Sequence, residues 1–148
     1  MVDEQITESP IGWVNRHVQQ YLETDGVKGH HFHGYDALLL TTRGRKSGVL
    51  RRTALYYGMD ADRYVLVASN GGSPTHPLWY LNLAANPQVE LQVGGERFAA
   101  QARTATGEER ARLFALMASI FAPYDEYQAR AGREIPVVVL DRAPKKIG

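Results

Sequence analysis

The chain has 148 residues, of which 44% are hydrophobic and 22% charged, and its formal net charge at pH 7 is +1. A chain of this size normally builds a single core, so we expect one globular domain over residues 1–148. The absence of cysteine excludes thiol nucleophiles, disulfides, thiolate zinc sites and iron–sulfur clusters. The near-neutral charge balance excludes a general nucleic-acid-coating protein, although it permits a local basic site.

The start of the chain, Met1-Val-Asp-Glu-Gln, lacks the basic residues and apolar run of a secretory signal. No apolar run approaches the roughly 20 residues that cross a bilayer. We therefore expect a cytoplasmic protein, with residues 1–10 forming a disordered tail.

A helix is the first predicted element. Ser9-Pro10 is a helix-start signal, apolar residues recur at helical spacing over residues 13–22, and Asp25-Gly26 should end the helix. Five short segments rich in β-branched and aromatic residues then predict strands at 37–42, 53–59, 64–69, 88–93 and 97–103. Gly94-Gly95 predicts a two-residue hairpin turn between the last two.

Helices are also predicted between and after these strands. A short helix with Pro77 in its first turn ends at Asn86-Pro87. A longer helix begins at Thr106, whose spacing to Glu109 is that of a capping box. It should break at Pro123, before a short helix over 124–130 and a last strand over 135–140. Five or six mostly antiparallel strands with three or four helices predict an α+β fold with a barrel-like sheet.

Residues 37–59 contain no acid but carry five cations: Arg43, Arg45, Lys46, Arg51 and Arg52. The turn at 41–48 combines cations, glycines and hydroxyls, which together could bind phosphate or carboxylate. It is not a P-loop, because the required glycine spacing is missing. The alternative is a hairpin loop whose charges are only solvated.

Three other segments are candidates for a site. In 68–72, small residues permit close backbone approach to a flat ligand, and Ser69 could donate to a carbonyl. In 78–82, Leu78 and Leu81 are expected in the core, while two aromatic residues could flank a ligand. Tyr124 and Tyr127 share a helix face and could donate a hydrogen bond or a proton. The alternatives are an ordinary turn, core aromatics and packed surface tyrosines. A metal site at His30, His31 and His33 is not expected, since no acid stands at metal-ligand spacing.

In this order, the segments resemble the deazaflavin-dependent nitroreductase family of actinobacteria over about residues 11–141. The matching stretches are Leu38-Leu-Leu-Thr-Thr-Arg-Gly-Arg-Lys-Ser-Gly48, Val67-Ala-Ser-Asn-Gly-Gly72, His76-Pro-Leu-Trp-Tyr-Leu-Asn-Leu-Ala-Ala-Asn-Pro87, Thr104-Ala-Thr-Gly-Glu-Glu-Arg-Ala-Arg112, Tyr124-Asp-Glu-Tyr-Gln128 and Ile135-Pro-Val-Val-Val139. The resemblance implies a split β-barrel and coenzyme F-420, an 8-hydroxy-5-deazaflavin with a phosphate and a polyglutamate tail.

The resemblance also implies roles for individual residues. The phosphate and tail would be held by the basic turn, through Arg45, Lys46, Ser47, Gly48, Val49, Leu50 and Arg51. The ring would be lined by Ala68, Ser69, Asn70, Leu78, Trp79, Tyr80, Leu81, Asn82 and Tyr124. Tyr124, Tyr127 and Ser69 match the family's catalytic positions. Two departures are Phe121, where the family has a third tyrosine, and Asn70, where a lysine is frequent; they weaken the expectation of nitroimidazole reduction and of tight tail binding.

The implied reaction is hydride transfer from the reduced coenzyme to an electron-poor small molecule, such as an enone, quinone, coumarin-like compound or nitroaromatic. Alternatives are an oxidase that uses flavin mononucleotide (FMN), a non-catalytic carrier of the deazaflavin, and a module that holds single-stranded nucleic acid through the basic turn with Tyr56 and Tyr57. We expect no nucleic-acid partner, at most weak membrane contact through the N-terminal helix, and a monomer or homodimer.

Overall fold

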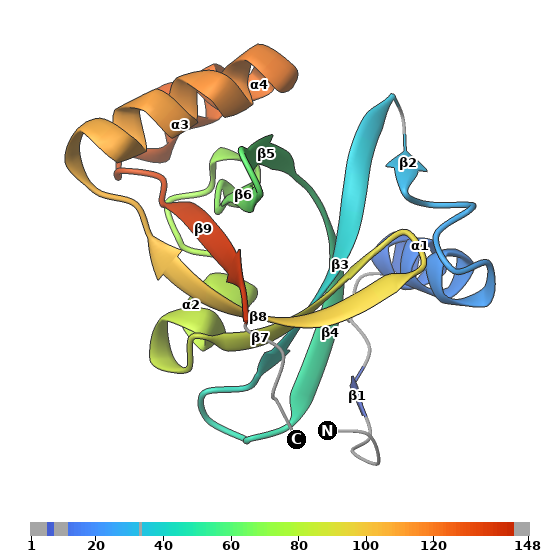
Figure 1. The fold of residues 1–148 in the computed structure, drawn as a ribbon. Helices are drawn as coiled ribbons and strands as arrows, with labels where there is room; N and C mark the ends of the chain where they lie inside the picture. Colours follow the sequence, from blue (N-terminus) through green and yellow to red (C-terminus); the bar gives the residue numbers. More distant parts are fainter. Residues whose placement is uncertain (1–5, 8–11, 33, 144–148) are drawn as a thin grey trace.

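The structure is a computed structural model that describes residues 6–7, 12–32 and 34–143 (Figure 1). Its elements follow in chain order: β1 (Ile6–Thr7), α1 (Gly12–Glu23), β2 (His31–Phe32), β3 (Tyr35–Arg43), β4 (Leu50–Tyr56), β5 (Gly58–Asp60), β6 (Arg63–Val67), the 3₁₀ turn η1 (Asn70–Gly72), α2 (Leu78–Ala85), β7 (Gln88–Val93), β8 (Glu96–Thr104), α3 (Gly107–Ile120), α4 (Pro123–Ala131) and β9 (Val137–Arg142).

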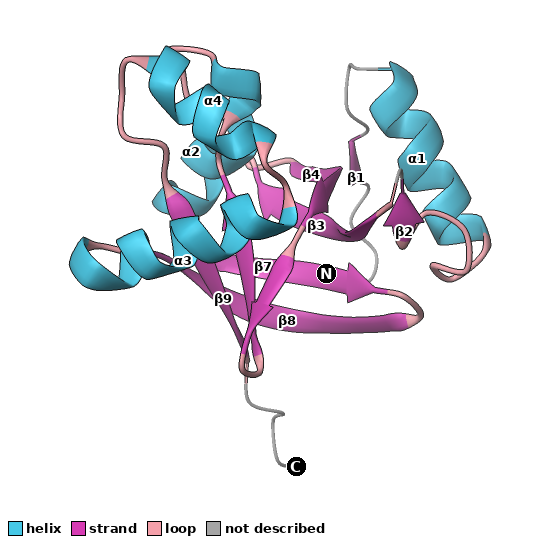
Figure 2. Ribbon diagram, turned by 90° about the horizontal axis from the view of Figure 1, so that it is seen from above, coloured by secondary structure: helices cyan, strands magenta, loops and turns pink. Residues whose placement is uncertain are grey.

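A curled sheet organises the fold. Its strand order, in the part of the chain described, is β1-β4-β3-β7-β8-β9-β6-β5, with β2 paired to β3. All these pairs are antiparallel except β1 with β4. Figures 1 and 2 show α1 on one side of the molecule, apart from α2, α3 and α4. The predicted α+β fold with a mostly antiparallel, barrel-like sheet is confirmed.

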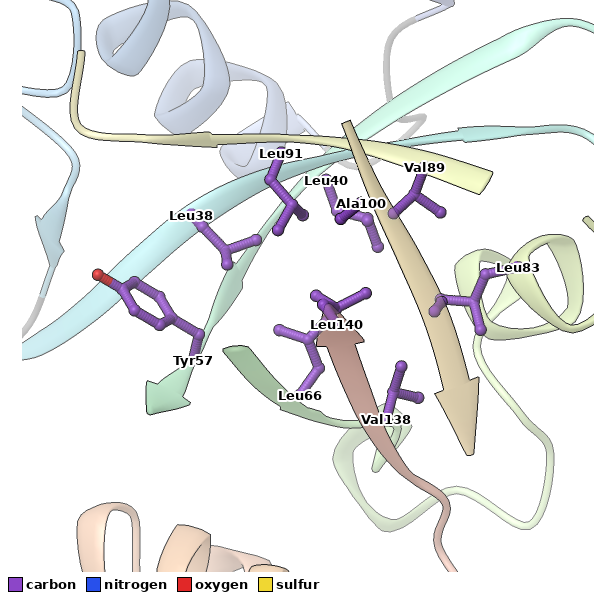
Figure 3. Close-up of a cluster of buried hydrophobic side chains, with 11 residues drawn as sticks. Leu38, Leu40, Tyr57, Leu66, Leu83, Val89, Leu91, Ala100, Val138 and Leu140 are labelled. Atoms are coloured by element: carbon purple, nitrogen blue, oxygen red, sulfur yellow. The ribbon is translucent and has the colours of Figure 1, made fainter. Parts of the chain in front are cut away.

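The inside of the curled sheet holds the main core (Figure 3). Val138 and Leu140 of β9 point into it, whereas Val137 and Val139 pack in a second cluster with residues of α3 and α4. Because side chains alternate along a strand, β9 is covered on both faces, which explains its continuous apolar sequence.

Helix α1 packs on the outer face of β3. Val18 and Tyr21 form a small cluster with Leu39, while the residues on either side of Leu39 face the main core. The buried Tyr21 hydroxyl accepts a hydrogen bond from Gly94 N at 2.6 Å and donates to Ala37 O at 3.1 Å. The apolar face of α1 is therefore occupied by the protein's own core.

Several predicted boundaries are confirmed. Strand β7 occupies the predicted range, and Val93 pairs with Glu96, so Gly94-Gly95 is the two-residue turn. The strand expected at 53–59 is instead divided into β4 and β5, which pair with different neighbours. The short strands β1 and β2 were not predicted.

Two sequence-based expectations are wrong. Thr106 is the N-cap of α3, but its side chain makes no capping hydrogen bond. Glu109 does not complete a capping box, because Arg103 of β8 binds its carboxylate through two hydrogen bonds of 2.6 and 3.0 Å. Leu78, expected in the core, is 70% exposed, since α2 turns Asn82 and Leu83 inward instead.

The expected disordered tail does not hold at Ile6–Thr7, which pair with Leu50 and Arg51. Residues 1–5, 8–11, 33 and 144–148, including the predicted helix start at Ser9-Pro10, lie outside the described residues. None of the helices in the described ranges is long and apolar enough to cross a membrane.

Candidate functional site

A cleft of about 1000 Å³ opens between the β3–β4 hairpin and the segment that runs from the end of β6 into α2. The junction of α3 and α4 contributes aromatic side chains to it, and Val14 and His17 of α1 also line it. The cleft therefore collects residues from four separate parts of the chain.

Most of the site residues expected from the sequence line this cleft. Those that do are Arg45, Lys46, Ser47, Arg51, Ser69, Asn70, Leu78, Trp79, Asn82, Tyr124 and Tyr127. Those that do not are Gly48, Val49, Leu50, Ala68, Tyr80 and Leu81. The second group belongs to the same segments of the chain but does not line the cleft.

Cations gather along the hairpin side of the cleft. Arg45, Lys46 and Arg51 are exposed, and Arg52 is partly buried. Burial lowers the pKa of Arg52, because the charged guanidinium loses hydration. None of the four forms an ion pair with another residue of the described ranges. Their positive charge is available to an anionic ligand.

The turn that carries these cations is held in shape by its neighbours. Arg43 Nη1 donates to Gly48 O at 2.7 Å, and Gly48 has a φ of +73°, in the left-handed region that favours glycine. The buried Asn82 accepts a hydrogen bond from Arg45 N at 3.1 Å and donates to Thr42 Oγ1 at 3.3 Å. Asn82 thus fixes the basic turn to α2, a role that the sequence did not reveal.

The segment after β6 forms another wall. Ser69 is buried at the start of the turn η1 and donates no hydrogen bond from its hydroxyl to the described residues. Asn70 adopts a φ of +49°, and its side-chain amide donates to Thr75 O at 3.1 Å. A Cβ on Gly72 would lie 3.1 Å from the Cα of Tyr127, so glycine permits α4 to approach this turn.

Aromatic rings close one end of the cleft. The ring centre of Phe121 is 4.9 Å from that of Tyr124 and 5.6 Å from that of Tyr56. Tyr124 and Tyr127 lie 6.3 Å apart, as their spacing on one helix face predicts. Tyr124 is only 6% exposed, and burial raises the pKa of its phenol, with smaller contributions from Tyr127 and Tyr56. Its hydroxyl stays protonated and makes no hydrogen bond within the described chain.

Fifteen further lining residues were given no individual role in coenzyme binding or catalysis from the sequence. They are Val14, His17, Thr42, Gly44, Arg52, Thr53, Ala54, Leu55, Tyr56, Val67, Gly71, Thr75, His76, Pro77 and Phe121. The stretch without acidic residues extends over the whole of β4, so the sequence contained a signal that the β4 residues could belong to an anion-binding site. The contributions of α1 depend on tertiary packing and leave no local signal.

Tyr57 bears on the nucleic-acid alternative. It is buried, and its hydroxyl lies 2.8 Å from His30 Nε2. A ring in this position cannot stack on a base. Of the two tyrosines that the nucleic-acid alternative used, only Tyr56 therefore remains available for stacking.

Comparison with known proteins identifies relatives. Residues 13–142 match the family model described as "F420H(2)-dependent quinone reductase". A protein of Mycobacterium tuberculosis with that same description is 42% identical over 143 residues, which cover 88% of this chain and 96% of the relative.

Solved structures give the same result. A structure described as an F420-H2 dependent reductase (FDR-A) is 40% identical, with a TM-score of 0.66 over 71% of this chain and 93% of that one. Another, described as a domain-swapped dimer, is 40% identical, with a TM-score of 0.68 over 90% of this chain and all of that one.

Proposed function

Because the chain belongs to the F420H(2)-dependent quinone reductase family, we propose that its cleft binds the reduced deazaflavin coenzyme and directs hydride transfer to a quinone-like acceptor. The single observation that carries the assignment of this cleft is the different chemistry of its two ends. Four cations without an ion pair among the described residues lie on the hairpin side, and a cluster of aromatic rings lies at the α3–α4 end.

The residues present fit the coenzyme. A phosphate and a polyglutamate tail are polyanionic, and Arg45, Lys46 and Arg51 offer exposed donors that form no ion pair with a carboxylate of the described residues. A flat ring requires close backbone approach and apolar contact, which the small residues after Ser69 and the side chain of Trp79 supply. A cleft of about 1000 Å³ is large enough for a ligand of this size.

When bound, the reduced coenzyme supplies the hydride. A quinone that accepts a hydride develops negative charge on a carbonyl oxygen, which a protonated donor stabilises. Tyr124 keeps its proton because burial raises its pKa, and its hydroxyl is not engaged by the described chain. We assign Tyr124 as the principal donor, with Tyr127 and the Ser69 hydroxyl as further polar groups. The aromatic end also excludes water from the reacting atoms.

The first experiment is a fluorescence titration of the protein with the deazaflavin coenzyme beside FMN, followed by steady-state reduction of a naphthoquinone. Saturable preference for the deazaflavin, with turnover that depends on the quinone, is the expected result. Equal or tighter binding of FMN would move the protein to the oxidase alternative. A compact FMN phosphate would leave part of the row of cations unused, which is why we favour the deazaflavin.

A carrier of the coenzyme is the second candidate. Against it stands the Tyr124 hydroxyl in the cleft, which makes no hydrogen bond to the described residues and which simple storage of a coenzyme does not require. Tight binding without turnover on quinone, enone or nitroaromatic acceptors would support the carrier.

The assembly state is a monomer or a homodimer. A structural relative at 40% identity is described as a domain-swapped dimer, which supports the homodimer for this chain. Light scattering on the eluted protein distinguishes the two states, since a dimer doubles the measured mass.

A further inference from the structure

His76 lines the cleft just before α2, and nothing in the proposed function assigns it a role. Its Nδ1 lies 2.9 Å from Nη1 of Arg133, and its ring centre is 5.0 Å from that of Tyr80. The imidazole is therefore held in place on two sides while it still borders the cleft.

The other side-chain nitrogens of Arg133 donate hydrogen bonds to backbone oxygens of the segment that precedes His76. Arg133 lies just beyond α4, where its Nε donates to Ser73 O at 3.1 Å. Its Nη2 donates to Ser69 O at 3.1 Å and to Thr75 O at 3.0 Å. A guanidinium is always protonated and has donors only, so Nη1 must donate to His76, and Nδ1 must accept.

This contact fixes the tautomer of the imidazole. A neutral ring that accepts at Nδ1 carries its proton on Nε2. Protonation of Nδ1 would replace the acceptor with a second donor that faces Arg133. Burial, and then the charge of Arg133, lower the pKa of His76, which keeps the ring neutral at pH 7.

The Nε2–H group has no hydrogen-bond acceptor among the described residues. We propose that His76 binds the coenzyme by donating its Nε2–H to one of the coenzyme's oxygen atoms. This inference rests on the proposed function. The position of His76 in the cleft supports this proposal. On one side, Arg133 hydrogen-bonds both His76 and the backbone oxygen of Ser69. On the other side, α2 follows His76 in the chain and carries Asn82, which accepts a hydrogen bond from the basic turn. His76 thus lies on the segment between the groups assigned to the ring and those assigned to the tail.

The first test uses the wild-type protein. In ¹⁵N-resolved NMR spectra of the histidine rings at pH 7, His76 should show a protonated Nε2 and an unprotonated Nδ1. Saturation with the coenzyme should shift the Nε2 signal. An Nε2 signal that stays unchanged at saturation overturns the proposal.

Two variants separate the donor from the ring. His76→Phe keeps an aromatic ring beside Tyr80 but removes the donor, whereas His76→Gln can accept from Arg133 through its oxygen and still donate through its amide. We expect the coenzyme Kd to rise about tenfold for His76→Phe, the effect of one lost hydrogen bond, and to return toward wild type for His76→Gln. His31→Phe is the matched control, because His31 is exposed and pairs with Asp36 outside this cleft.

A deazaflavin nucleoside without phosphate and tail locates the acceptor. Weaker binding of both ligands to His76→Phe places the acceptor oxygen on the nucleoside part, and weaker binding of the full coenzyme alone places it on the phosphate or tail. Unchanged affinity for both overturns the role of His76. If the wild-type protein does not bind the coenzyme, the proposed function itself fails. If it does bind and His76→Phe binds equally well, only this inference fails. A variant that does not fold leaves the decision to the wild-type NMR titration.

Discussion

Tyr124 is the residue on which the assigned chemistry depends most directly. Its phenol is buried beside Phe121, and its raised pKa keeps the hydroxyl protonated throughout the neutral and mildly alkaline range. We expect Tyr124→Phe to lower kcat for a quinone about a hundredfold, because the donor to the developing oxyanion is lost. The coenzyme Kd, measured by fluorescence titration, should change little.

The matched control for that variant is Tyr35→Phe, which removes a hydroxyl from the same aromatic cluster but from a residue that does not line the cleft. Its kcat should equal that of the wild type. Equal kinetics for Tyr124→Phe and wild type would remove Tyr124 from the mechanism.

Phe121 occupies the position where the resembled family has another tyrosine. Its ring packs against Tyr35, Tyr56 and Tyr124, and it lines the cleft. Phe121→Tyr adds a hydroxyl at this end, and we expect it to raise the rate on a nitroaromatic about tenfold, the effect of one hydrogen bond of about 1.4 kcal/mol at the transition state. A rate ratio of nitroaromatic to quinone that is the same in both proteins would contradict this role.

Residues of this site could be predicted from the sequence where reactive side chains stand at a spacing that brings them together within one element. Tyr124 and Tyr127 are three residues apart on one helix, so their approach could be predicted from the chain alone. His76 could not be selected in this way. Its tautomer depends on Arg133, which lies 57 residues further along the chain, and no local pattern encodes that contact.

At the scale of an element, the β3–β4 turn presents its cationic side chains to solvent. Arg45 and Lys46 are exposed and have no ion pair within the described chain. We expect Arg45→Ala and Lys46→Ala each to raise the coenzyme Kd roughly threefold to tenfold, because each removes a charged donor to an anion. The midpoint of thermal unfolding should stay within a degree or two of the wild type, roughly the effect of a surface substitution.

Lys28→Ala is a suitable control for the turn variants, since Lys28 is exposed but lies outside the cleft. If a folded protein that lacks both Arg45 and Lys46 binds the coenzyme as tightly as wild type, the turn does not hold the tail.

The pairing of a strand with a neighbour close in the sequence could be predicted, whereas pairing with a distant segment could not. The Gly94-Gly95 hairpin joins neighbouring strands, and its turn residues determine the register. In contrast, β1 pairs with β4 across more than forty residues, and a two-residue strand has no periodicity to detect. The capping box failed for a different reason: Arg103, only six residues before Glu109, binds the Glu109 carboxylate from the end of the preceding strand.

At the scale of the whole molecule, a net charge of +1 conceals an uneven distribution. Cations and acids pair across the outer surface, as in Arg112 with Asp60 and Arg142 with Glu96. The cleft cations have no such partners in the described chain, so the positive potential is concentrated where an anionic tail would lie. Long-range attraction of the coenzyme therefore comes from this one region rather than from overall charge.

This distribution predicts how salt affects binding. Exposed charges are screened over about 10 Å at 0.1 M salt and about 3 Å at 1 M, so the coenzyme Kd should rise by about an order of magnitude across that range. The deazaflavin nucleoside, which lacks phosphate and tail, should bind with a Kd that is nearly independent of salt, because aromatic and apolar contacts are not screened. Parallel titrations of the two ligands measure the difference. Equal salt dependence for both would mean that the cations of the hairpin do not contact the tail, even if the ring occupies the cleft as proposed.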